Sequence, residues 1–404
     1  MPKREAILVD LKEAEQIIFI SYGFHIAERL AKYFKSDVLI KCIFEHEEPS
    51  SRNSQYFKQV IGRSLGLSEN CYGIKLSKQK LMSRQDAFGF LEKNANKLTS
   101  CLFKYSKTAN LNDFDKANVL LLAYFSNSKK MNFLSFLNLF VINQSLFQDK
   151  ILWVYLSSKN VNAIARWLKI NIEEEFEEIA NDLYLGKIIF ISGAGRITEV
   201  VLSNKYVSKI NILYGFDLND DCYNVLYRCV SFAGISGDNT FENAVSAETP
   251  FYYCSTNFKK KMPGFKAISN IVTNKLIISP EVKKQLLLYL EVEPFFTFSN
   301  GSSDVKKVKE ITERFRQLDL IAVAEGLRQL CVYLKSNHNF YDHLERIFLE
   351  NISVIPAAKE VAICIPGTIF HHKEAQQSSE LATDIANHPV DSKINERIIS
   401  EFVP

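Results

Sequence analysis

Residues that could bind an anion gather between positions 230 and 254. An apolar stretch typical of a buried strand ends at Ser236 and Gly237, and glycine permits a sharp turn close to a ligand. Three residues of types that cap helices follow: Asp238, Asn239 and Thr240. The free N–H groups of a helix start attract anions, and ligands of open α/β sheets bind beyond the carboxyl ends of strands. The pattern predicts an anion site, with Glu242 placed to reach a sugar hydroxyl; a capped helix without ligand is the alternative.

His25 is the candidate for proton transfer. It follows an apolar strand predicted at 17–21 and opens a helix predicted at 26–34. An imidazole with a pKa near 6.5 can accept a proton from a hydroxyl at neutral pH. The alternative is a histidine that only caps or packs against its helix.

A second glycine turn, Gly193-Ala194-Gly195, follows the strand predicted at 187–192. It matches part of a dinucleotide-binding motif but lacks the third glycine, so an NAD-dependent oxidoreductase would depend on this turn alone. Arg196 comes next, and its guanidinium could neutralise a phosphate or simply face solvent. The eight cysteines form no close Cys-x-x-Cys pair, which argues against zinc.

These residues need an alternating α/β framework to position them. Further strands are predicted at 38–44, 118–125, 151–156, 209–214, 230–235 and 250–254. Helices are predicted at 85–103, 132–147, 197–202, 221–228, 239–247, 304–316 and 318–334. The pattern predicts two similar α/β domains, 1–149 and 150–370, followed by a helix or tail at 371–404.

The composition limits the function further. The chain has 404 residues, 47% of them hydrophobic, which suits two folded domains. Its 49 basic and 46 acidic residues leave a net charge of +3, so a nucleic-acid partner is not expected. No run of about 20 apolar residues predicts a transmembrane segment, and the N-terminus lacks a signal-peptide core. We expect a cytoplasmic protein, or one in a host cytosol if a bacterium secretes it.

The segments Ser-Gly-Asp-Asn-Thr-Phe-Glu-Asn-Ala (236–244) and Glu-Thr-Pro-Phe-Tyr-Tyr (248–253) resemble a known element. They are similar to the donor site of GT-B glycosyltransferases, and most of all to the Gly-Glu-Asp-Ser-Phe and Lys-Pro-Phe segments of protein-arginine rhamnosyltransferases. The resemblance implies two Rossmann-like domains facing each other across a cleft, with additional C-terminal helices. The close match covers about 25 residues, and the two-domain layout extends it along the chain.

The resemblance also implies a function. A nucleotide sugar, UDP- or dTDP-linked, would be the co-substrate, His25 the base, and a protein or glycan the acceptor. Gly237, Asn239 and Thr240 would meet the diphosphate, while Asp238 or Glu242 would bind the ribose or the sugar. The predicted donor-binding residues are Gly193, Arg196, Ser236, Gly237, Asp238, Asn239, Thr240 and Glu242. We expect no metal and no other cofactor.

One departure from the family leaves an alternative open. The paired aspartates of the rhamnosyltransferase N-terminal loop are missing from residues 21–25, so the arginine acceptor is not carried over. The segment 45–108 is also irregular. A catalytically inactive GT-B-like binding or interaction protein is therefore the second interpretation.

Overall fold

The chain is described from a computed structural model, which divides into two compact units. The larger unit comprises residues 79–258 and 269–335, and the smaller unit comprises residues 1–78, 259–268 and 336–404. The residues that the structure describes are 16–21, 39–44, 66–67, 71–77, 80–125, 130–143, 146, 150–157, 186–201, 208–253, 258–292, 305–342, 361–365 and 368–372.

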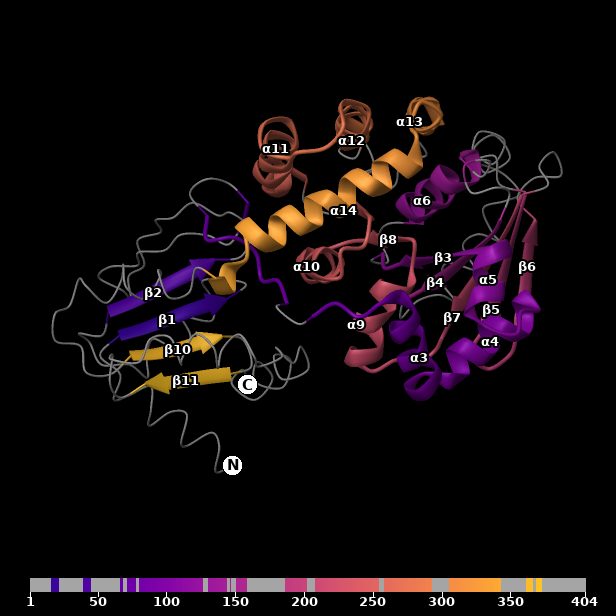
Figure 1. The fold of residues 1–404 in the computed structure, drawn as a ribbon, viewed down its shortest axis with the longest axis horizontal. Coiled ribbons are helices and arrows are strands. Elements are labelled where there is room, and N and C mark those ends of the chain that lie inside the picture. The colour runs from indigo at the N-terminus through magenta and orange to yellow at the C-terminus, as the bar shows by residue number, and fades with distance from the viewer. Residues whose placement is uncertain are drawn as a thin grey trace. The chain divides into compact units, whose positions relative to one another are not determined.

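A seven-stranded sheet forms the centre of the larger unit (Figure 1). Its spatial order is β6-β5-β7-β4-β3-β8-β9, and all neighbours are parallel except the antiparallel pair β5–β6. The strands are β3 (Asn118–Ala123), β4 (Ile151–Leu156), β5 (Lys187–Ser192), β6 (Ile197–Val201), β7 (Lys209–Tyr214), β8 (Phe232–Ile235) and β9 (Phe251–Tyr253). The predicted α/β class is thus confirmed.

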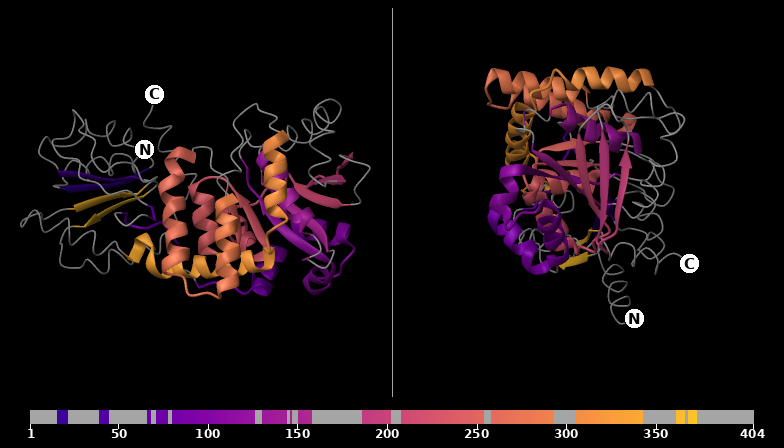
Figure 2. Two further views of the ribbon diagram at one scale, coloured as in Figure 1. Left: turned by 90° about the horizontal axis from the view of Figure 1, so that it is seen from above. Right: turned by 90° about the vertical axis from the view of Figure 1, so that its right-hand side faces the viewer.

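Helices cover both faces of this sheet (Figure 2). The helix α6 (Lys130–Ile142) connects β3 to β4 on one face, while α9 (Asp220–Cys229) and α10 (Asp238–Ser246) flank β8 in the chain and cover the other face (Figure 1). Right-handed crossovers require this arrangement, because the chain moves in opposite directions along the sheet in the two connections. The remaining helices are α3 (Arg84–Asn94), α4 (Asn96–Ser106), α5 (Leu111–Ala117), α11 (Phe258–Asn274), α12 (Pro280–Val292), α13 (Val305–Phe315) and α14 (Leu320–Asn337).

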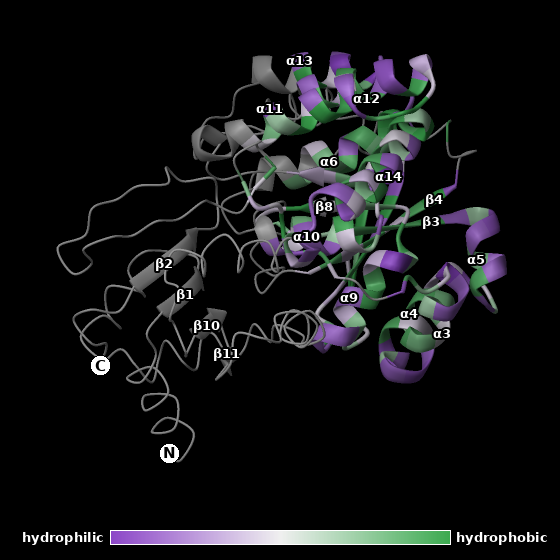
Figure 3. Ribbon diagram, turned by 60° about the vertical axis from the view of Figure 1, so that its left-hand side comes forward, coloured by the Kyte–Doolittle hydropathy of each residue, from purple (hydrophilic) through white to green (hydrophobic). Residues whose placement is uncertain are grey.

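The central strands form a hydrophobic core, which Figure 3 shows as green ribbons between helices of mixed colour. Every residue of β3 and β8 is buried. On the α6 face the Phe136 ring packs edge-on against Phe140 and Tyr252, with ring centroids 5.1 and 5.5 Å apart. Aromatic rings supply much apolar area to a core, so this cluster anchors α6 to the sheet.

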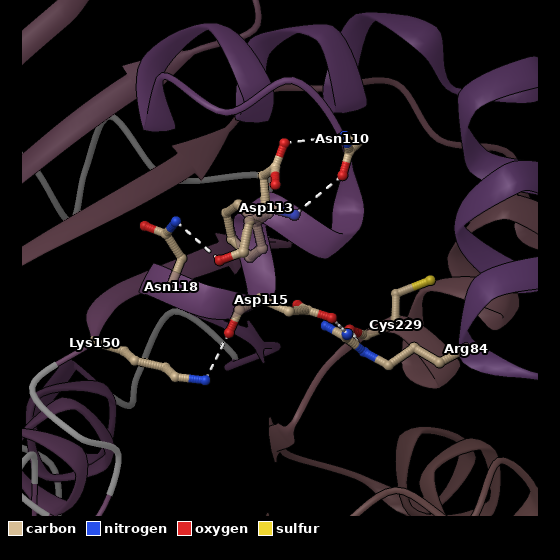
Figure 4. A network of polar contacts seen from close by, with 8 residues as sticks. Arg84, Asn110, Asp113, Asp115, Asn118, Lys150 and Cys229 are labelled. Atoms are coloured by element: carbon tan, nitrogen blue, oxygen red, sulfur yellow. Dashed lines mark hydrogen bonds and ion pairs between the residues drawn. The ribbon is translucent and has the colours of Figure 1, made fainter.

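A polar network lies at the edge of the sheet where the central strands begin, their amino ends (Figure 4). Arg84 of α3 pairs with the Asp115 carboxylate of α5 and donates through Nε to the Cys229 carbonyl oxygen at 3.1 Å. Lys150 Nζ donates to the Asp115 carbonyl oxygen at 2.6 Å. The network joins α3, α5 and α9 around the starts of β3 and β4.

Asp113 and Asp115 form an Asp-x-Asp triplet, a pattern of metal-dependent glycosyltransferases that the analysis of the sequence overlooked. Asp113 accepts hydrogen bonds from Lys116 Nζ at 3.1 Å and Asn110 Nδ2 at 3.0 Å, and Asp115 pairs with Arg84. Both carboxylates serve the polar network, at the edge of the sheet away from the strand ends where ligands bind.

We expect Arg84→Met to lower the free energy of unfolding by about 1–3 kcal/mol, because the half-buried Asp115 carboxylate and the Cys229 carbonyl both lose their partner. Lys116→Met is the matched control on α5. It breaks an exposed ion pair with Asp113 and should cost less than about 0.5 kcal/mol. Urea unfolding measures both free energies. Equal losses in the two variants would contradict the structural role given to Arg84.

The smaller unit contains a four-stranded sheet of order β11-β10-β1-β2. Its strands are β1 (Gln16–Ser21), β2 (Leu39–Phe44), β10 (Val361–Ile365) and β11 (Thr368–His372). The strand β1 is parallel to both β2 and β10, and β1 and β2 lie at the strands predicted at 17–21 and 38–44. In the same unit, the Ile74 N–H donates to the His338 carbonyl oxygen at 2.9 Å.

Two features of the sheets depart from the predicted domain boundaries. The strand β3 precedes residue 149 but pairs with β4 and β8, in the larger sheet. The strands β10 and β11, around residue 370, join the sheet that contains β1. Partners far along the chain determine which sheet a strand joins, and local periodicity does not reveal them.

Candidate functional site

The order of the strands places a topological switch point between β3 and β8. From β3 the chain proceeds to β4 and then to β5 and β7 on one side, and it returns to β8 and β9 on the other. Open α/β sheets bind ligands at the carboxyl ends of strands where the order reverses in this way. The predicted Ser236-Gly237 turn follows β8 directly and therefore lies at this point.

Two hydrogen bonds join the loop after β3 to the end of β8 and to the turn that follows it. The Tyr124 N–H donates to the Gly234 carbonyl oxygen at 2.7 Å, and Ser236 Oγ donates to the Tyr124 carbonyl oxygen at 3.2 Å. Because its hydroxyl proton is used in this bond, Ser236 fixes the turn to the neighbouring loop. Tyr124 itself is 38% exposed at this edge of the sheet.

Gly237 gives the turn its shape. Its φ of 107° and ψ of 161° belong to a region of backbone angles that residues other than glycine rarely adopt. No heavy atom lies within 4 Å of the position that a Cβ would take. The first helical bond runs from the Phe241 N–H to the Gly237 carbonyl oxygen at 3.1 Å. The helix therefore begins at Asp238, so the N–H groups of its first turn and its positive dipole end lie at this edge of the sheet. A helix start of this kind favours a nearby anion.

The side chains at the start of α10 differ in their exposure to solvent. Thr240 is 8% exposed, and its Oγ1 donates to the Gly237 carbonyl oxygen at 2.9 Å, so its hydroxyl closes the turn. Asn239 is exposed and Glu242 is half-buried. The contacts of these residues with phosphate or sugar stay predictions, as does that of Asp238.

Tyrosines that the sequence analysis did not single out surround this edge. The Tyr223 ring lies edge-on to Tyr124 and Tyr227, with centroids 6.4 and 5.6 Å apart. Burial raises the pKa of Tyr223 to about 12, and it also raises the pKa values of Tyr155 and Tyr227. The signal available in the sequence was the position of Tyr124, immediately after a buried strand.

The second glycine turn proves to be a hairpin. The segment 197–202, predicted as a helix, contains the strand β6, which is antiparallel to β5. A Cβ added at Gly193 would lie 2.6 Å from the Gly215 carbonyl oxygen, so close packing against the loop after β7 explains this glycine. Without a helix after the turn there is no dinucleotide-binding motif, and the oxidoreductase interpretation loses its only support.

Arg196 lies far from Gly237. It is exposed in this hairpin, and its N–H donates to Ser192 Oγ at 2.9 Å. Four strand spacings separate β5 from β8, which amounts to about 19 Å at about 4.8 Å each. Arg196 and Gly193 therefore do not join Gly237 at one diphosphate, and the prediction that they bind the donor there is corrected.

Three other expectations concern His25, a metal site and a membrane-spanning segment. His25 lies outside the described residues. Within the described ranges, no group of three or more His, Cys, Asp or Glu residues could hold a metal ion. None of the helices described is long and apolar enough to cross a membrane.

Comparison with known proteins gives matches among solved structures. No protein-family model and no curated protein matches the chain. A structure on EarP-mediated arginine glycosylation of translation elongation factor EF-P matches with TM-score 0.39 and 10% identity, over 83% of this chain and 98% of that chain. A UDP-forming trehalose-phosphate synthase from Burkholderia xenovorans matches with TM-score 0.31 and 10% identity, over 86% of this chain and 64% of that one.

A third match is the wall teichoic acid polymerase TagF, with TM-score 0.21 and 11% identity, over 80% of this chain and 89% of that chain. Two of these three solved structures concern glycosyl chemistry, namely arginine glycosylation and UDP-forming trehalose-phosphate synthesis. All three TM-scores lie below 0.5.

Proposed function

We propose that the protein is a GT-B-type glycosyltransferase that moves a sugar from a nucleotide donor to a protein or glycan acceptor. The observation that carries the proposal is the Gly237 turn. It lies at the switch point of the larger sheet, its surroundings leave room at the glycine, and α10 begins there with its positive dipole end. The diphosphate of a UDP- or dTDP-sugar carries the negative charge that such a position attracts.

In the proposed reaction an acceptor hydroxyl attacks the anomeric carbon of the sugar. The bond from that carbon to the diphosphate oxygen breaks, and the negative charge on the leaving group is stabilised by the N–H groups at the start of α10. His25 takes the proton of the hydroxyl as general base. The cleft between two Rossmann-like domains, the metal independence and the cytoplasmic location belong to this proposal.

Calorimetry with UDP, dTDP, GDP and ADP, each with and without EDTA, tests the donor site. We expect at least one nucleoside diphosphate to bind, with an affinity that EDTA leaves unchanged. If none binds, the proposal is wrong. Loss of binding in EDTA would instead overturn only the metal independence.

Incubation with radiolabelled nucleotide sugars tests the chemistry. Slow release of free sugar by the wild-type protein supports an enzyme, and His25→Ala should lower that rate while leaving diphosphate affinity unchanged. Tight binding without release of sugar from any donor would support the inactive binding protein instead.

A further inference from the structure

We infer that Tyr223 is a positioning residue for the proposed donor site, because it holds the loop after β3 in the place where that loop supports the Gly237 turn. The inference rests on the proposed function for its ligand, and it concerns a residue of α9 that need not touch that ligand.

The first link is the contact between two rings. Tyr223 lies in the first turn of α9, where Asn219 caps the helix by accepting from the Cys222 N–H at 2.8 Å. Its ring stands edge-on to Tyr124, with an interplanar angle of 63°. Tyr124 is partly exposed, so the contact with Tyr223 restricts a side chain that solvent would otherwise leave free.

The second link is the main chain of Tyr124. Its N–H and carbonyl groups bond to Gly234 and Ser236, the residues on either side of the last residue of β8. A displacement of Tyr124 would therefore displace the residue that precedes Gly237. The inferred path thus runs from Tyr223 through Tyr124 and Ser236 to the turn.

The third link is the buried position of the Tyr223 hydroxyl. This hydroxyl lies near those of Tyr227 and Ser157, the residue that follows β4. The Ser157 N–H donates to the Ala123 carbonyl oxygen at 2.9 Å, which joins the loop after β4 to the end of β3. From the first turn of α9, the Tyr223 side chain thus lies against Tyr124 in the loop after β3 and near Ser157 in the loop after β4.

Two substitutions separate the ring from the hydroxyl. Tyr223→Phe keeps the ring and should hold the affinity for the bound nucleoside diphosphate within about twofold, whereas Tyr223→Ala should lower it about fivefold to tenfold. Leu98→Ala, in the buried part of α4, is the control for general destabilisation. An affinity loss in Tyr223→Ala no larger than that in Leu98→Ala would overturn the inference.

A second measurement needs no ligand. In protein labelled with 3-fluorotyrosine, ¹⁹F NMR detects the Tyr124 ring, assigned with Tyr124→Phe. We expect its resonance to shift in Tyr223→Ala and to stay near its place in Tyr223→Phe. If no nucleoside diphosphate binds the wild-type protein, the proposed function fails while this experiment still decides the inference; an unchanged Tyr124 resonance in Tyr223→Ala refutes it.

Discussion

Gly237→Val should lower the affinity for a nucleoside diphosphate about 10- to 100-fold. The φ of 107° at this position disfavours any side chain, and relieving that strain of about 1–3 kcal/mol would turn the N–H groups of α10 away from their present directions. The open space around the glycine is also where an approaching phosphate would meet the new methyl groups. Calorimetry at a temperature where the variant is folded measures the loss.

Gly195→Val is the matched control. Gly195 also has a positive φ, 79°, and an added Cβ would have no neighbour within 4 Å, so the backbone cost should be similar. It lies in the hairpin after β5, four strands from β8. The affinity of Gly195→Val for a nucleoside diphosphate should match that of the wild-type protein. Equal losses in the two variants would show that strain alone, rather than the position of the turn, weakens binding.

The second large effect concerns Gly234 in β8. A Cβ added there would lie 2.6 Å from Phe125 Cζ, at the tip of a ring that is 3% exposed. Phe133 and Phe136 surround this ring, so it cannot rotate away without opening the core. We expect Gly234→Ala to lower the free energy of unfolding by about 1–3 kcal/mol, measured by urea unfolding.

Gly89→Ala makes the same chemical change, but it should raise the free energy of unfolding rather than lower it. Gly89 lies within α3, and nothing stands within 4 Å of the place that its Cβ would occupy. Alanine has the higher helix propensity, so this variant should gain about 0.5–1 kcal/mol. A stabilised Gly234→Ala would mean that the Phe125 ring adapts and that glycine is not required in β8.

Much of the fold of the larger unit could be predicted from residue patterns. The strands β4, β5 and β7 begin and end at the predicted residues, because short continuous apolar runs such as Ile-Leu-Trp-Val-Tyr-Leu are typical of strands buried on both faces. The segment after Gly195 was predicted wrongly. Five residues with apolar positions at 197, 200 and 201 fit a helical face and a strand equally well, and pairing with β5 decided between them.

The candidate site was predicted in part. The glycine and the capping residues after β8 are local signals, and they led to Gly237 and α10. The distance between Arg196 and that turn depends on strand order, which no local pattern reveals. Tyr124 and Tyr223 were missed for the same reason, since 98 intervening residues separate their positions in the chain.

The place of β3 in the middle of its sheet has a consequence for biosynthesis. Its partner β4 begins 33 residues later, as Asn118 pairs with Ile151, but its other partner follows only after 111 residues, as Leu121 pairs with Phe232. Closing so long a loop slows folding. A ribosome must therefore finish most of the larger unit before the two loops that would hold a donor can meet, and a chain truncated ahead of residue 232 would have no place for the donor.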